Sequence, residues 1–267
     1  MTTPNVPLRM ELTFEMPGTP EQVWDAIATA NGISSWMVPT DMDEREGGAL
    51  VFHMGDTDSP GTVTGWDPPR RFVYEEPDWA DLGQHPDADV TPMVTEFLIE
   101  AQSGGTCLLR VVTSAFGTGA DWENEFFDDM ARNWAPMFEN LRLYLTHFPG
   151  QRVTPMYVEA DVPGATDAVW SAMRRELGAR EVGAAIEARG LTGQVGRIGI
   201  SPAPNQLLMR LADPVPGLMY FMAWDKGDGL TNASVAGYLF SEDAPSFVER
   251  ETPAWKAWLE DLAIPAA

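Results

Sequence analysis

His53 is the residue of this sequence best suited to act as a polar handle. It lies in the apolar segment VFHMG, which reads as a strand, on the face opposite Phe52. A buried imidazole can donate a hydrogen bond to a ligand or exchange a proton with it. Histidines in such positions are more often half-exposed or hydrogen-bonded for structural reasons. The sequence leaves both interpretations open.

The other reactive side chains form no catalytic or metal-binding pattern. His85, His147 and Cys107 lie far apart, so no metal-ligand spacing arises, and we expect neither a metal nor a cofactor. Cys107 lies on an alternating strand and is predicted to be a small buried hydrophobic residue. The chain contains no GxSxG elbow and no lysine-bearing phosphate loop. Catalysis by a serine or cysteine nucleophile therefore has no support.

Charged residues offer a second kind of chemistry. Glu96 and Arg110 lie on two long predicted strands and could pair inside a cavity, where they would orient a ligand. A solvated pair across neighbouring strands is the more common arrangement. A run of acidic residues could suggest a metal site, but at successive helical positions it indicates a charged surface. These acidic residues are Glu123, Glu125, Asp128 and Asp129.

The element that must position any site is a helix predicted from Asp121 to about His147. Apolar residues recur there every three or four positions and form one stripe. They are Trp122, Phe126, Met130, Trp134, Phe138, Leu141 and Leu145. Pro136 is expected to kink the helix or split it in two. So long an aromatic stripe requires a curved sheet to cover it.

The residues before this helix supply such a sheet. Alternating apolar and polar residues predict strands at 10–16, 41–46, 49–54, 62–66, 71–75, 94–101 and 106–115. Thr19, Pro20 and Gln22 predict a capped helix after the first strand. A brief turn or helix carrying Trp36 follows it. We expect a turn at 56–61 and a mobile loop at 77–92. Helices segregated on one side of an antiparallel sheet give an α+β fold.

Composition restricts the partners. The chain has 267 residues, 44% of them apolar, and a net charge of −23. That charge repels nucleic acids and anionic membranes, so we expect no nucleic acid among its partners. One cysteine fits a reducing compartment. The sequence shows no signal peptide and no apolar run long enough for a membrane span, so we expect a cytoplasmic protein without membrane insertion. Its oligomeric state is not predictable.

Part of the pattern occurs twice. MPGTPEQVWDAI, which begins at Met16, matches VPGATDAVWSAM, which begins at Val162, and no gap is needed. WAPMFENL at Trp134 resembles WKAWLEDL at Trp255, and GWDPPRRFVYEE at Gly65 resembles ISPAPNQLLMRL at Ile200. Three matches in the same order indicate a duplication. We therefore predict two domains, residues 1–149 and 150–267, the second shorter.

The first half resembles the SRPBCC superfamily, also called START-like or helix-grip, and is most similar to the branch named for the activator of the heat-shock-protein ATPase. The resemblance rests on PGTPEQVWDAI, NGISSWMVP, the GGALVFHM hairpin, GTVTGWDPPRRFVYEE and the final aromatic helix. The second half resembles the family weakly, because it lacks counterparts of GISSWMVP and of the GGALVF hairpin. The resemblance implies a curved antiparallel sheet wrapped around a long C-terminal helix, present twice, with the second copy degenerate.

Family members mostly bind apolar small molecules in a cavity between sheet and helix, and a minority catalyse cyclisation, dehydration or hydrolysis there. The resemblance thus implies that aromatic and Met side chains of the first domain line such a cavity. The candidate ligand-binding residues are Trp36, His53, Trp66, Phe97, Phe116, Trp122, Phe126, Met130 and Trp134. Each of them is individually more common as an ordinary core residue.

Three hypotheses about function follow. The leading one is binding of a hydrophobic small molecule, such as a lipid, a polyketide or an aromatic metabolite, in the first domain. The second is an enzyme of the cyclase, dehydratase or hydrolase kind, with His53 as acid or base. The third, suggested by the family's name, is a chaperone-associated interaction module. The net charge disfavours the third, because it weakens association with acidic partners.

Overall fold

The computed structural model describes residues 6–55, 57–200 and 203–262. The chain divides into two compact units, Met1–Gly150 and Gln151–Ala267, and each is described by itself. The elements of the first unit are β1 (Val6–Pro17), α1 (Pro20–Ala28), α2 (Ala30–Ser34), β2 (Thr40–Met42), β3 (Ala49–Met54), β4 (Thr57–Asp67), β5 (Arg71–Glu76), α3 (Trp79–Leu82), β6 (Met93–Ala101), β7 (Thr106–Gly117) and α4 (Asp121–His147).

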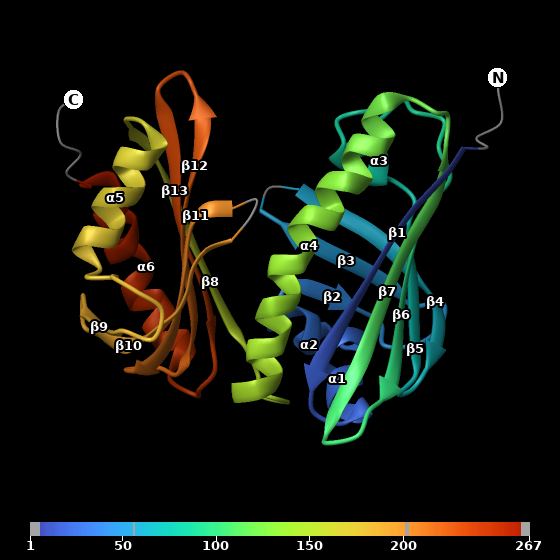
Figure 1. Cartoon of the computed structure of the whole chain (residues 1–267), viewed down its shortest axis with the longest axis horizontal. Helices are drawn as coiled ribbons and strands as arrows, with labels where there is room; N and C mark the ends of the chain where they lie inside the picture. The colour runs from blue at the N-terminus through green and yellow to red at the C-terminus, as the bar shows by residue number, and fades with distance from the viewer. Residues whose placement is uncertain (1–5, 56, 201–202, 263–267) are drawn as a thin grey trace. The chain divides into compact units, whose positions relative to one another are not determined.

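The strands of the first unit form one antiparallel sheet in the order β1-β7-β6-β5-β4-β3-β2. The sheet curves around α4, which crosses one of its faces (Figure 1). Alternation along each strand sends every second side chain to this inner face. Phe97 pairs with both Val111 and Phe72, so three neighbouring strands present apolar residues to the helix in one row. The predicted grip of a sheet around the aromatic helix is confirmed.

The local sequence signals explain where the first helices begin. Thr19 accepts a hydrogen bond from the Gln22 backbone N–H at 3.4 Å, and the Gln22 side chain accepts one from the Thr19 N–H at 2.9 Å. This reciprocal pair satisfies two backbone donors at the start of α1, as the predicted capping box requires. The inner face of α1 is Val23, Trp24 and Ile27, all buried. The Trp24 ring lies 6.3 Å from that of Phe72, an inner-face residue, so α1 packs on the same face of the sheet as α4.

Several expectations about the connections need correction. Of the two outcomes expected at Pro136, a kink or a split, the split is wrong, since α4 is one element over its whole length. The predicted turn at 56–61 is instead the start of β4, where Ser59 pairs with Phe52 (Asp56 lies outside the described residues). The loop at 77–92 contains α3, and fully buried Trp79 anchors it by donating from its indole N–H to the Thr91 carbonyl at 2.9 Å.

One buried carboxylate closes the connection between β7 and α4. Oε1 of Glu123 accepts from the backbone N–H and the hydroxyl of Thr118, both at 2.8 Å, and Oε2 accepts from the Gly119 N–H at 2.9 Å. Burial raises the pKa of this carboxyl, but the hydrogen bonds to its charged form outweigh burial and leave the pKa below its usual value. The interpretation of Glu123 as a surface charge was therefore wrong.

Glu123 also dictates its neighbour. A Cβ atom at Gly117 would lie 2.2 Å from Oε2 of Glu123, far inside van der Waals contact. Only glycine leaves room for the carboxylate at the end of β7. The last residue of β7 and the first turn of α4 are therefore packed in direct contact.

The second unit repeats this plan with fewer elements. They are β8 (Thr154–Pro163), α5 (Thr166–Glu176), β9 (Ala185–Ala188), β10 (Leu191–Ile200), β11 (Ala203–Asp213), β12 (Gly217–Gly227), β13 (Leu230–Leu239) and α6 (Ala244–Glu260). The sheet order is β8-β13-β12-β11-β10-β9, so the first strand again pairs with the last and the others follow in reverse order.

The differences between the units match the gaps in the repeat. Between the first and last helices the second unit has one strand fewer, and no helix corresponds to α2. Its interior is packed around Trp255, Trp258 and Phe221, with ring centroids 5.2–6.3 Å apart. The Arg189 guanidinium lies 5.0 Å from the Trp255 ring, a cation–π contact. In the described parts of both units, no helix is long and apolar enough to cross a membrane.

The Glu123 contacts generate a stability prediction. Glu123→Gln places an amide group, itself a donor, against backbone donors, so we expect it to destabilise the protein by about 1–3 kcal/mol at neutral pH. The cost is expected to shrink as the pH falls through the carboxyl's lowered folded pKa, because protonated Glu123 loses the same acceptors. Urea unfolding at several pH values measures both effects.

Glu125→Gln is the matched control, since Glu125 is exposed on the same helix. We expect it to change stability by less than about 0.5 kcal/mol. Equal effects of the two substitutions would show that the Glu123 contacts contribute nothing specific.

Candidate functional site

Aromatic rings from the sheet and α4 meet on the inner face of the first unit. Phe97 lies parallel to Trp134, with ring centroids 6.5 Å apart and planes 13° apart. Phe138 touches both rings, at 6.4 and 5.8 Å, and stacks on Phe14 at 4.3 Å. The structure thus brings the candidates Phe97 and Trp134 together, with Phe138 as the ring common to their contacts.

Trp36 and Trp66 border this cluster. The Trp36 ring lies 5.4 Å from Phe138, and its N–H donates to the Ala26 carbonyl at 2.9 Å. Trp66 packs edge-on against Trp24 of α1 at 5.0 Å. Trp66 therefore joins α1 to the sheet and Trp36 joins α1 to α4, and the indole N–H of Trp36 is already hydrogen-bonded.

The remaining helical candidates form a second cluster nearer the start of α4. Trp79 of α3 lies 5.5 Å from Trp122 and 5.1 Å from Phe126. Met130 belongs to the same apolar cluster, which also contains Met93 of β6. Trp122 and Phe126 are half-buried, so part of each ring remains accessible.

Phe116 does not line the interior. It is 50% exposed, while the adjacent Ala115 is buried in the cluster around Trp79. Because successive residues of a strand point to opposite faces, Phe116 lies on the outer face of the sheet. Its inclusion among the ligand-binding residues is corrected accordingly.

A row of buried polar side chains crosses the inner face between the two aromatic clusters. Tyr74, Thr95 and Thr113 are direct neighbours on β5, β6 and β7. The threonine hydroxyls are 3.1 Å apart, and Thr95 is hydrogen-bonded to Tyr74. All three are buried, and burial raises the pKa of Tyr74 well above its usual value. The row gives an otherwise apolar surface a defined set of hydroxyl groups.

Glu76 extends this row and is its one carboxyl group. It follows Tyr74 by two positions on β5, so it shares the inner face, and only 6% of its surface is exposed. Its Oε1 accepts a hydrogen bond from the Ser59 hydroxyl at 2.6 Å. Burial raises its pKa to about 7, against the lowering effect of Ser59. This carboxyl therefore exchanges its proton near neutral pH.

Sequence reasoning missed this row, although the signal was present. The segment RFVYEE alternates so that Phe72, Tyr74 and Glu76 share one face. The predicted strand ended at Glu75, one residue short, and the acidic pair looked like a solvated strand end. Only the register with β4, which brings Ser59 and Gly61 beside Glu76, shows that this position is enclosed.

A groove of about 550 Å³ opens at the edge of the first unit, between α4 and the paired ends of β1 and β7. Its lining includes Phe14 and Met16 from β1, Thr106 from β7 and Phe138 and Arg142 from α4. Arg142 is paired with Glu139 at 2.8 Å. The stacked rings of Phe14 and Phe138 are thus shared between the groove and the inner aromatic cluster.

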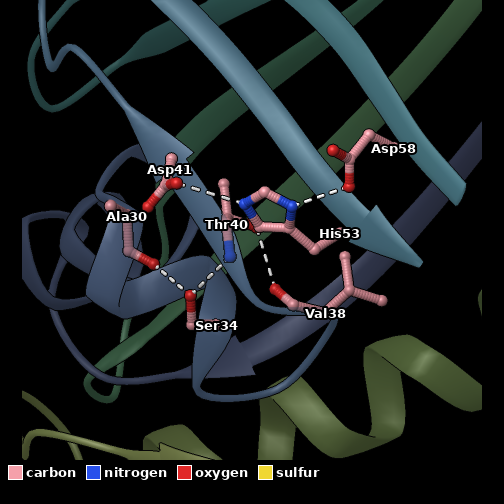
Figure 2. Close-up of polar contacts among 7 residues, drawn as sticks. All are labelled: Ala30, Ser34, Val38, Thr40, Asp41, His53 and Asp58. Atoms are coloured by element: carbon pink, nitrogen blue, oxygen red, sulfur yellow. Dashed lines mark hydrogen bonds and ion pairs between the residues drawn. The ribbon is translucent and has the colours of Figure 1, made fainter. Parts of the chain in front are cut away.

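His53 lies on the outer face of β3 and joins three strands (Figure 2). Its Nδ1 is 2.8 Å from Asp58 of β4 and its Nε2 is 3.1 Å from Asp41 of β2. Hydrogen bonds to Asp58 and then Asp41 raise its pKa. The side chain is 36% exposed. His53 therefore faces away from the interior that it was expected to line.

The remaining charged candidates also lie outside. Glu96 pairs with Arg71 at 2.5 Å, and Arg110 lies 3.5 Å from Glu11. These are solvated pairs between neighbouring strands, with different partners from those predicted. Within the described residues, no group of three or more His, Cys, Asp and Glu side chains is arranged to hold a metal ion.

The His53 network generates a pH-dependent prediction. Because its folded pKa is raised, its contribution to stability is fully present below the unfolded pKa and is lost as the pH rises through the folded value. His53→Gln is therefore expected to lower the free energy of unfolding, measured with urea, more at pH 5.5 than at pH 9, and by less than about 1 kcal/mol because the pair is exposed. His85→Gln, outside the network, serves as control. Equal losses at both pH values for His53→Gln would contradict the prediction.

Comparison with solved structures gives several likenesses. Protein MLL2253 from Mesorhizobium loti is 15% identical, with a TM-score of 0.45 over 53% of this chain and 98% of its own. The Aha1 dimer from Colwellia psychrerythraea is 16% identical, with a TM-score of 0.41 over 52% and 96%. The di-domain ARO/CYC BexL from the BE-7585A biosynthetic pathway is 12% identical, with a TM-score of 0.44 over 97% and 100%. The strand order, not these likenesses, establishes the fold.

Comparison with sequence families is more specific. No curated protein matches the chain. Residues 17–146 match the family model described as Activator of Hsp90 ATPase homolog 1-like protein. This range runs from the end of β1 to the last turn of α4 and includes the polar row and the groove and cluster residues of β4 to α4, but not those of β1 before Pro17. The resemblance inferred from the sequence is thereby confirmed: residues 17–146 carry the pattern of the Activator of Hsp90 ATPase homolog 1-like family.

Proposed function

We propose that the first unit binds a hydrophobic small molecule between its sheet and α4. The observation that carries the proposal is the composition of the inner face, where aromatic and Met side chains surround a short row of buried hydroxyls and one carboxyl. Small-molecule sites characteristically combine apolar walls with a few placed polar groups. Binding of a lipid, a polyketide or an aromatic metabolite would be consistent with this surface.

The groove beside Phe14 and Phe138 is the proposed entrance. Its volume of about 550 Å³ is within the range of about 300–1,000 Å³ typical of ligand pockets. Phe138 forms one wall of the groove and also contacts Phe97 and Trp134 of the inner cluster. Rotation of this ring and of its partner Phe14 would connect the groove to the aromatic interior.

The alternative of an enzyme with His53 as acid or base has no support in the geometry. Both ring nitrogens of His53 are bonded to carboxylates on the outer face (Figure 2). A general acid or base must be within hydrogen-bond reach of the reacting group, which here would lie on the other side of the sheet. No observation favours the chaperone-associated module over ligand binding.

The proposal is tested with fluorene, a neutral polyaromatic hydrocarbon, by native mass spectrometry and by a thermal-shift titration. We expect the full chain to bind it with one site. Trp134→Ala removes a wall of the inner cluster and is expected to weaken binding by about tenfold, the equivalent of roughly 1.5 kcal/mol for an aromatic contact.

Trp224→Ala is the matched control. Trp224 is 44% exposed and belongs to the second unit, so its removal is expected to leave the affinity unchanged. Absence of binding to fluorene and to a panel of lipids and polyaromatics would refute the proposal. Equal affinity of Trp134→Ala and Trp224→Ala for fluorene would show that the ligand does not bind at the inner aromatic cluster.

A further inference from the structure

Glu76 is a carboxyl group in a place where a charge is costly. It is 6% exposed, and in the described part of the chain its one hydrogen-bond partner is the Ser59 hydroxyl, on Oε1. Oε2 has no such partner among those residues. No Lys, Arg or His of the described ranges forms an ion pair with it. Moving an unpaired carboxylate out of water is so unfavourable that the group holds its proton instead.

The elements packed around Glu76 supply no positive charge. Ser59 and Gly61 approach it from β4, and Met93 is its partner on β6. Tyr74, on its own strand, is the titratable group near enough for its pKa to be raised by the Glu76 charge. Met93 belongs to an apolar cluster whose buried members come from β1, β6, β7, α3 and α4. Among the described residues, the Ser59 hydroxyl is the one group that stabilises the ionised form by a hydrogen bond.

A neutral carboxylic acid has a hydrogen to donate, which a carboxylate lacks. The hydroxyl of Ser59 already donates to Oε1, so the acid proton on the other oxygen remains available. Two hydrogen bonds join the three hydroxyls of Tyr74, Thr95 and Thr113, so they use two of their three donor hydrogens. Glu76 is the member of the polar row whose available donor is lost when the group ionises.

We propose that Glu76, as the neutral acid, donates a hydrogen bond to a carbonyl or similar acceptor oxygen on the ligand, so that the site selects uncharged aromatic ketones or quinones over the corresponding hydrocarbons and over carboxylates. This inference rests on the proposed function, because it presupposes a ligand between sheet and α4. It adds the chemical class of that ligand and the residue that selects it.

The experiment uses two probes of the same shape, 9-fluorenone and fluorene, which differ by one carbonyl group. At pH 5.5 the intact chain is expected to bind fluorenone about fivefold more tightly than fluorene, the gain from one hydrogen bond. At pH 8.5, where Glu76 has lost its proton, that preference is expected to disappear. Fluorene-9-carboxylate is expected to bind more weakly than either probe at pH 8.5.

Two variants separate donor chemistry from packing. Glu76→Gln keeps a donor that does not titrate, so its preference for fluorenone is expected to persist at both pH values. Glu76→Leu removes the donor and is expected to bind the two probes equally at both. Far-ultraviolet circular dichroism confirms that each variant is folded before its affinities are compared.

The outcomes distinguish the two proposals. Binding of both probes with the same ratio at pH 5.5 and pH 8.5 in the unmodified chain would overturn the role of Glu76 and leave the proposed function standing. Binding of neither probe would overturn this inference, and the panel of lipids and polyaromatics would then decide the proposed function separately. A preference for fluorenone that survives in Glu76→Leu would assign the donor to another residue and overturn the proposal.

The protonation state of Glu76 can also be tested without a ligand, from the pH dependence of stability. An acid whose folded pKa is raised to about 7 stabilises the fold most below its unfolded pKa, and this contribution declines as the pH rises toward 7. The urea midpoint of the unmodified chain is expected to fall between pH 5.5 and pH 8.5 by more than that of Glu76→Gln. Identical pH profiles would show that Glu76 is ionised in the fold and would overturn the proposal.

Discussion

Burial of the aromatic stripe of α4 is the constraint on which the first unit depends. A helix with Trp, Phe and Met along one side cannot remain in water, because each ring buries a large apolar area. The strands cover the stripe with apolar side chains on their inner face. Phe97 is an example, because its ring contacts Phe72 of the sheet and Trp134 of α4. The curvature of the sheet, the position of α1 and the place of the groove all follow from covering this stripe.

The same constraint explains why a polar row is informative. In a core whose main task is to cover aromatic rings, hydroxyl and carboxyl groups carry a desolvation cost that leucine or valine would avoid. Hydrogen bonds among Tyr74, Thr95 and Thr113, and from Ser59 to Glu76, offset part of that cost. These residues lie on the inner face, where apolar side chains would avoid the cost.

Much of this architecture is readable from the sequence because it depends on local periodicity. The bounds of α4, the capping box at Thr19 and strand β3 follow from spacing alone. The alternation of residues also placed His53 opposite Phe52, as the structure shows.

Other positions were not predictable in this way. Phe116 was assigned to the inner face because it is an aromatic residue near the end of a long strand, but its register relative to Ala115 places it on the outer face. Glu76 could not be recognised, because its enclosure depends on β4, a neighbour that no local pattern identifies. Glu123 looked like one of four surface acids, since its acceptors, Thr118 and Gly119, lie in a loop whose path is set by the whole fold.

The fit between Gly117 and Glu123 has an evolutionary consequence. A side chain at position 117 needs the volume that the carboxylate occupies, and a shorter residue at position 123 leaves the backbone donors of Thr118 and Gly119 without acceptors. A substitution at either position alone is therefore expected to destabilise the fold. Among descendants of this chain the two sites are therefore coupled, and a lineage that abandons glycine at the strand end has to rebuild the entry into the helix in the same step.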